Sequence, residues 1–278
     1  MNILLHAAGL LLVGSSAGAF GALLGLGGGI FLVPLLVLIF ELPMRSAVGA
    51  SLVCVIATSC AASSMNLTDG PANPRLGAAL EPATVLGALL GALAAPLLPA
   101  RALALLFALL LSYVTILLWR GREIAKEQTP LKSSAQHATI FDAAYYDPRL
   151  KKEVSYTVER FPLCAAVSGL AGVFSALLGV GGGIIKVPAM NLLGRVPLKA
   201  AAATSTLMIG ATASTSAVLY LLRGDVPVFT AGTTALGVLA GSWMGLKLSH
   251  RIHDHALKRV FSAATFFFSL QMFWKALR

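Results

Sequence analysis

Long apolar stretches separated by short polar ones make up most of the chain. Most of them are long enough to cross the roughly 30 Å hydrocarbon core of a bilayer as α-helices. Two have only 13 residues, so that a helix there would cover about 20 Å. This pattern predicts an all-α integral membrane protein. The expected segments are 3–24, 28–40, 46–67, 77–99, 102–119, 161–178, 182–194, 200–222, 227–247 and 259–276.

A glycine-rich motif occurs twice and leads into each of the short stretches. Residues 17–34 read AGAFGALLGLGGGIFLVP and residues 171–188 read AGVFSALLGVGGGIIKVP, and the two agree at 13 of 18 positions. A duplicated motif that interrupts apolar helices with glycines is typical of transporters built from two repeats. The correspondence continues at the same offset in Pro43 and Pro197, Ser51 and Ser205, and Thr58 and Thr212.

Each motif is expected to form a re-entrant helical hairpin that bends inside the membrane. Glycine tolerates left-handed backbone angles, and the short helix after it cannot cross the bilayer. If each hairpin enters and leaves on the same side, each half has five segments and the two repeats are inverted. Fifteen basic residues then lie on the cytoplasmic side and five outside, against twelve and eight if each hairpin crosses once. The five-plus-five arrangement therefore fits the positive-inside rule better.

The one long polar stretch separates the two halves. We expect an N-terminal membrane repeat at 1–120, a cytoplasmic linker or small cap at 121–160, and an inverted C-terminal repeat at 161–278. Apolar residues form 57% of the chain and charged residues 12%, about half the charged share of a soluble domain. We therefore attribute the net charge of +10 to basic residues that flank spans, and not to nucleic-acid binding.

With these motifs the chain resembles the sulfite exporter TauE/SafE family of membrane transporters. The resemblance rests on GLGGGIFLVP and GVGGGIIKVP, on the duplication and on the polar linker, and it covers nearly the whole chain. It implies transport of sulfite, sulfonates or other organosulfur anions. Because some members are described as exporters and others as uptake proteins, the resemblance does not give the direction.

The glycine turns are the first candidate for an anion site. The helix after each turn begins with unpaired backbone N–H groups and the positive end of its dipole, both of which favour an anion. Inverted repeats would point the two helix starts at one cavity near the midplane. The alternative is that the glycines only let helices pack closely. The candidate residues are Gly25, Gly27, Gly28, Gly29, Gly179, Gly181, Gly182 and Gly183.

Lys186 is the second candidate, because it lies three residues after Gly183 inside an apolar helix. A charge at that depth costs a few kcal/mol or more unless it is paired or faces water. We expect no acidic residue in the neighbouring apolar segments, so an anionic substrate is the natural partner. The alternative is that the ammonium snorkels to the headgroups.

Hydroxyl residues that recur in both halves could complete the coordination of an anion. Serine and threonine in membrane helices also bond backbone carbonyls of their own helix, which is an equally good interpretation. The candidates are Ser51, Thr58, Ser205 and Thr212.

Several other residues carry weaker signals. The segment HRIHDH at 250–255 has a spacing that could hold a metal ion, but loop charges are the simpler interpretation. Glu81 or Asp225 could carry a coupling proton, with a surface position as the default. Helix-packing roles are expected for Cys54, Cys60 and Cys164.

The sequence therefore predicts a secondary transporter or facilitator of small sulfur-containing anions in the cell inner (plasma) membrane. The negative cell interior favours export. The alternatives are transport of another small anion or of a metal cation. Since the spans hold neither paired acids nor a nucleophile with a base, an intramembrane enzyme is not expected. We expect no cofactor and no nucleic-acid partner; lipid and the anionic substrate are the expected partners, and a homodimer stays open.

Overall fold

The protein is described by a computed structural model that covers residues 3–24, 28–69, 71–124, 140–147, 152–249 and 254–277. Its first half contains α1 (Ile3–Leu24), α2 (Gly29–Leu38), α3 (Met44–Asp69), α4 (Pro74–Ala94), the 3₁₀ turn η1 (Ala95–Leu97) and α5 (Ala100–Ile124). Strands β1 (Ala143–Asp147) and β2 (Lys152–Tyr156) follow. The second half contains α6 (Phe161–Leu178), α7 (Gly183–Leu192), α8 (Leu198–Leu222), α9 (Val228–Ser249) and α10 (Asp254–Leu277).

The order of elements in the first half recurs in the second. In each half a long helix is followed by a helix of ten residues and then by three long helices. Gly29 begins the first short helix and Gly183 the second, and each of these helices contains a proline, Pro34 or Pro188. The two 13-residue apolar stretches therefore form the short helices that the sequence predicts.

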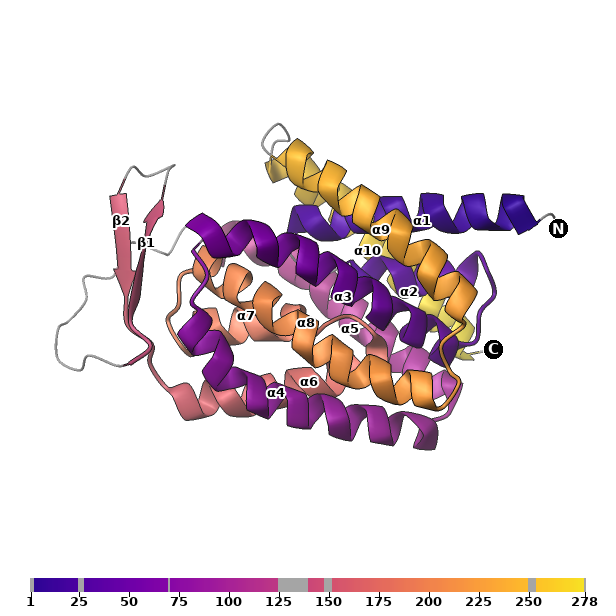
Figure 1. The fold of residues 1–278 in the computed structure, drawn as a ribbon, viewed down its shortest axis with the longest axis horizontal. Coiled ribbons are helices and arrows are strands. Elements are labelled where there is room, and N and C mark those ends of the chain that lie inside the picture. Colours follow the sequence, from indigo (N-terminus) through magenta and orange to yellow (C-terminus); the bar gives the residue numbers. More distant parts are fainter. Residues whose placement is uncertain are drawn as a thin grey trace.

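Helices pack mainly across the two halves. α1 lies along α9, and α6 lies along α4 in the equivalent way. α3 contacts α9 as α8 contacts α4, while the pairs α3–α8 and α5–α10 join equivalent helices. In Figure 1, α3 and α8 run side by side, with α4 and α6 below them and α1 and α9 above. Exchanging the two halves thus reproduces the main helix contacts.

Six helices of the described chain are long and apolar enough to cross a membrane, namely α1, α3, α4, α5, α6 and α8. α2 is a shorter apolar helix. Large apolar side chains are exposed on the outside of the bundle, among them Leu12, Leu90 and Trp243. Such a surface suits lipid rather than water, so the chain is a multi-pass membrane protein.

Glycines allow the closest contacts between helices of the two halves. A Cβ atom added at Gly87 in α4 would meet the carbonyl oxygen of Gly169 in α6, and one at Gly172 would meet that of Thr84. Glycines of α1 and α9 approach the facing backbone in the same way. Small residues serve this purpose in lipid, where no hydrophobic effect draws helices together.

The linker contains the one β-sheet of the described residues. β1 and β2 pair antiparallel, so the linker adds a small hairpin to a membrane part that is all helical, as the sequence predicts. The sequence KEVSY of β2 carries the alternation and the aromatic and β-branched residues that favour a strand. Residues 125–139 and 148–151 of the predicted linker lie outside the described residues.

Asn73, which caps α4, ties the linker to the helix bundle. Its side chain accepts a hydrogen bond from the backbone of Leu76 and donates to the Phe141 carbonyl (2.8 Å) and the Tyr156 hydroxyl (3.3 Å). Its backbone N–H donates to the Thr204 hydroxyl in α8 (2.9 Å). The β-hairpin is therefore fixed at the end of the bundle where α4 and α8 begin.

We expect Gly87→Ala to lower the free energy of unfolding by about 1–3 kcal/mol, because its methyl group would overlap the Gly169 carbonyl and push α4 from α6. Gly232→Ala in α9 is the matched control, since nothing lies within 4 Å of a Cβ there. Thermal unfolding of the purified variants in detergent measures the difference. A melting temperature of Gly87→Ala equal to that of the wild type would contradict this packing.

Candidate functional site

Left-handed glycines form the turns before the two short helices. Gly28 caps α2 with a φ of 69°, and Gly182 caps α7 with a φ of 72°. Gly179 and Gly181 also have positive φ, at 69° and 83°. Side chains of L-residues make these angles costly, which explains glycine at the four positions.

The two turns lie against each other inside the bundle. A Cβ atom at Gly29 would meet the carbonyl oxygen of Gly179, and the Ser51 hydroxyl in α3 donates to the same carbonyl (2.7 Å). The start of α2 and the turn before α7 are therefore neighbours. This approach shows that the glycines serve close packing, while anion binding by the same turns stays a prediction. Gly25 and Gly27 lie outside the described residues.

Each short helix begins with backbone N–H groups that no helical turn precedes. In α7 the first helical hydrogen bonds run from Ile185 and Lys186 to the Gly182 carbonyl, at 3.2 and 3.1 Å. The N–H groups of Gly183 and Ile184 lie before these bonds, at the positive end of the helix. α2 begins in the same way. These amides are the donors that the sequence predicts for an anion.

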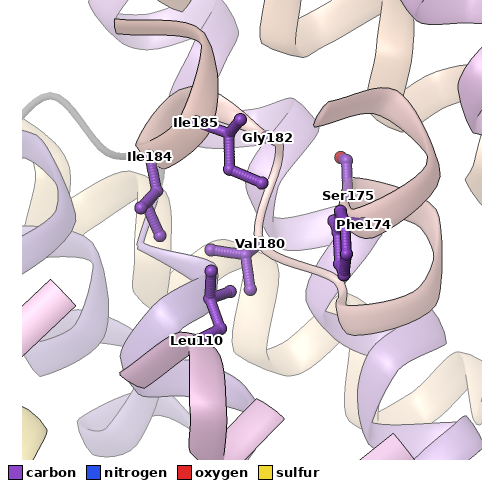
Figure 2. Close-up of a pocket in the computed structure, with 7 residues that line it drawn as sticks. All are labelled: Leu110, Phe174, Ser175, Val180, Gly182, Ile184 and Ile185. Carbon is purple, nitrogen blue, oxygen red and sulfur yellow. The ribbon is translucent and has the colours of Figure 1, made fainter. Parts of the chain in front are cut away.

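A small hollow lies beside the second turn, as Figure 2 shows. It is lined by Leu110 of α5, Phe174 and Ser175 of α6, Val180 and Gly182 of the turn, and Ile184 and Ile185 of α7. The Ser175 hydroxyl is buried and has no hydrogen-bond partner among the described residues. Sequence reasoning missed Ser175, because the equivalent position in the first motif is Gly21 and no hydroxyl recurs there.

Lys186 is completely enclosed, with 0% of the residue exposed. Its Nζ donates to the Thr212 Oγ1 in α8 at 2.9 Å. The snorkelling alternative is therefore wrong for this residue. An ammonium has three N–H donors, and within the described part of the chain Thr212 is the acceptor for one of them. The other two donors have no hydrogen-bond acceptor among the described residues.

A carboxylate lies on the other side of the same hydroxyl. The Thr212 Oγ1 is 3.1 Å from the Glu81 Oε1 of α4, and Glu81 is half-buried. The predictions that Lys186 has no acidic neighbour and that Glu81 lies at the surface are both wrong. Glu81 is far from Lys186 in the sequence, and only the packing of α4 against α8 brings its carboxylate near.

The four predicted hydroxyl residues fall into two pairs. Ser51 and Ser205 each lie beside the first glycine of a short helix. The Ser205 hydroxyl is buried and has no hydrogen-bond partner in the described residues. The Thr58 hydroxyl donates to a backbone carbonyl of its own helix at 2.9 Å, as the alternative interpretation has it. The single hydrogen of the Thr212 hydroxyl has two acceptors within reach, the Met208 carbonyl of its own helix at 2.9 Å and the Glu81 Oε1 at 3.1 Å. The serines are therefore nearer to the helix starts than the threonines.

The other candidates do not form a site. Across the described residues, no three His, Cys, Asp or Glu side chains lie close enough to hold a metal ion. In the segment 250–255, His250 and His253 are outside the described residues. The free thiols are Cys54 and Cys164, which are buried, and Cys60, which is exposed.

Comparisons with known proteins point to membrane transport. The family described as sulfite exporter TauE/SafE matches residues 10–272. The chain is 28% identical over 254 residues to the Bacillus subtilis probable membrane transporter protein YunE, covering 88% of this chain and 87% of the other. It is 28% identical over 267 residues to a probable membrane transporter protein of Xylella fastidiosa strain 9a5c, with 94% of each chain covered.

A plant protein matches over a shorter stretch. The chain is 33% identical over 126 residues to Arabidopsis thaliana sulfite exporter TauE/SafE family protein 5, which is 45% of this chain and 24% of the plant protein. No solved structure matches the chain significantly.

Ser51→Ala is expected to lower the free energy of unfolding by about 1–3 kcal/mol, because it leaves the buried Gly179 carbonyl without its donor. The equivalent change in the second half, Ser205→Ala, is the matched control. Since the Ser205 hydroxyl has no partner in the described residues, we expect a smaller change or none. Denaturant unfolding of both variants provides the comparison, and equal losses for both would contradict the assigned bond.

Proposed function

Because the chain belongs to the sulfite exporter TauE/SafE family of membrane transporters, we propose that it carries small sulfur-containing anions, such as sulfite or sulfonates, across the inner (plasma) membrane. The family and the relatives are transporters and not enzymes. The observation that carries the proposal is the enclosed ammonium of Lys186, which has two N–H donors left for a ligand.

The proposed architecture is a pair of inverted repeats, at 1–120 and 161–278, joined by a cytoplasmic linker at 121–160. Two features support it. The basic residues follow the positive-inside rule more closely if each half has five segments, with fifteen inside and five outside against twelve and eight. The main helix contacts are also preserved when the halves are exchanged. With an odd number of segments per half, α2 and α7 would enter the membrane from opposite sides as halves of re-entrant hairpins.

In the proposed site, the anion lies between the helix starts and Lys186. The ammonium supplies a full charge and the amides of Gly183 and Ile184 supply aligned donors, which together suit an oxyanion. Ser175 and Ser205 add two buried hydroxyls that lack partners in the described residues. The other residues proposed to line the site are Gly25, Gly27, Gly28, Gly29, Gly179, Gly181, Gly182, Ser51, Thr58 and Thr212.

The described conformation is taken as a closed state. The two turns touch, and the hollow beside them is small and mostly apolar. An anion would therefore enter only after the turns part, and alternate movement of the two hairpins would open the site to each side in turn. Removing an anion from water is unfavourable unless the site replaces its hydrogen bonds to water. In the proposed site the amides and Lys186 replace them. The membrane potential drives a lone anion outwards with about 2.3 kcal/mol per charge per 100 mV, which favours export.

A metal cation is a poorer cargo for this site. The enclosed charge is positive, and a cation would need carboxylate or imidazole ligands instead. Within the described residues no cluster of three such side chains is present. Another small oxyanion would make the same contacts as sulfite, so the experiment below compares several anions.

We expect Lys186→Met to lower the initial rate of anion transport by about ten- to hundredfold, since a hydrogen bond to a charged group is worth about 1.5–3 kcal/mol. The measurement is flux of labelled sulfite, a sulfonate and thiosulfate in proteoliposomes. Lys152→Met, at an exposed position of β2, is the matched control and is expected to transport like the wild type.

The wild type also tests the proposal itself. If it moves none of the three anions faster than empty vesicles do, the proposed function is wrong. A folded Lys186→Met protein with wild-type rates for a transported anion would instead exclude the assigned site.

A further inference from the structure

Glu81 is a charged group that the proposed binding site does not use. Its Oε1 is 3.1 Å from the Thr212 Oγ1, which accepts the hydrogen bond from the Lys186 Nζ at 2.9 Å. When the single hydrogen of the Thr212 hydroxyl is donated to Glu81, and not to the Met208 carbonyl at 2.9 Å, the ammonium and the carboxylate are linked through this hydroxyl. Lys186 is fully enclosed, whereas Glu81 is half-buried. The carboxylate is therefore the member of the pair that is in part accessible from outside the protein.

The charge balance of this pair changes when an anion arrives. With the site empty, the positive Lys186 and the negative Glu81 sum to zero. A monoanion bound to Lys186 would leave one net negative charge if Glu81 stayed ionised. A net charge in the membrane interior costs several kcal/mol. A proton on Glu81 removes this cost, because the loaded site is then neutral as well.

Lys186 is the one charged group of the described residues that faces Glu81. α4 packs against α6 and α8. Arg75 and Lys199 are exposed in the first turns of α4 and α8. The other titratable groups on these helices bond elsewhere: the Cys164 sulfur to a carbonyl of α7, the Tyr220 hydroxyl to a carbonyl of α6, and Arg223 to a carbonyl near the far end of α4.

We propose that Glu81 is the coupling residue of this transporter, and that it binds one proton for each monoanion carried. This proposal rests on the proposed anion transport. As the anion enters, the free N–H groups of Lys186 turn to it, and Glu81 takes up a proton from the same side. When the anion is released on the other side, Glu81 loses its proton to that side. Its negative charge then balances the positive charge of Lys186 again. Thr212 acts as a positioning residue that holds the two groups together.

Two consequences follow for the energetics of transport. Movement of a monoanion with a proton is electrically neutral, so the membrane potential no longer drives export. A pH gradient drives the net movement of the anion instead, from the more acidic to the more alkaline side. One pH unit is worth about 1.4 kcal/mol per proton, which corresponds to about tenfold accumulation of the anion on the alkaline side.

The first test uses the wild-type protein in proteoliposomes, with a labelled sulfonate or sulfite, whichever it carries. We expect accumulation when an inward proton gradient is imposed, and no accumulation when a potassium diffusion potential is imposed at equal pH. Accumulation that follows the potential and ignores the pH gradient would overturn the proposal. Absence of any transport would instead contradict the proposed function, so the two failures are distinguishable.

The second test is Glu81→Gln, which keeps the shape of the side chain but cannot exchange a proton. We expect proton-driven accumulation to fall about tenfold for a gradient of one pH unit, down to the level without a gradient. Exchange of labelled for unlabelled anion across the membrane should persist, because it needs only the loaded site. Persistent exchange also shows that the variant is folded.

Glu153→Gln is the matched control, because Glu153 is exposed on β2 and distant in sequence from the pair. It should keep both activities. Glu81→Gln that still accumulates the anion with the pH gradient would overturn the proposal. If Glu81→Gln loses both activities, the wild-type measurements decide between the outcomes. Accumulation with the pH gradient then supports the proposal, and accumulation that follows only the potential overturns it.

Discussion

The hydrogen bond from Lys186 to Thr212, with Glu81 behind it, is the interaction on which the centre of this protein depends. A charge in the membrane interior is tolerated only where polar partners enclose it. Here the three partners come from α7, α8 and α4, so that both halves contribute to one polar cluster. The positions of these helices are therefore tied to the charge, and any ligand that changes the charge also acts on the helices.

The parts of the fold that could be predicted are those with local signals. The length of the apolar stretches predicts the long helices, and GLGGG and GVGGG predict the turns before α2 and α7. Lys186 stands out because it is charged within an apolar segment. Its partner could not be predicted, because nothing near Glu81 in the sequence indicates that α4 packs against α8. Ser175 could not be predicted for a related reason, since its counterpart in the first motif is Gly21 and no hydroxyl recurs there.

Glycine has two different uses in this protein, and they limit what substitution can show. At Gly28 and Gly182 a positive φ is required, while at Gly29 and Gly87 the missing Cβ makes room for another backbone. An alanine at any of these positions would disturb the fold whether or not an anion binds there. Lys186 and Glu81 are therefore better probes of function, because their side chains can be replaced by others of similar size.

The exchange of helices between the halves has a consequence for biosynthesis. α1 has its main contacts with α9, which the ribosome makes more than 200 residues later. During synthesis α1 must wait in the bilayer with the glycine-lined face that later meets α9 exposed to lipid. The native bundle thus closes only near the end of translation, and contacts so distant along the chain make folding slow. Neither half, expressed alone, would contain the helix that covers its own first one.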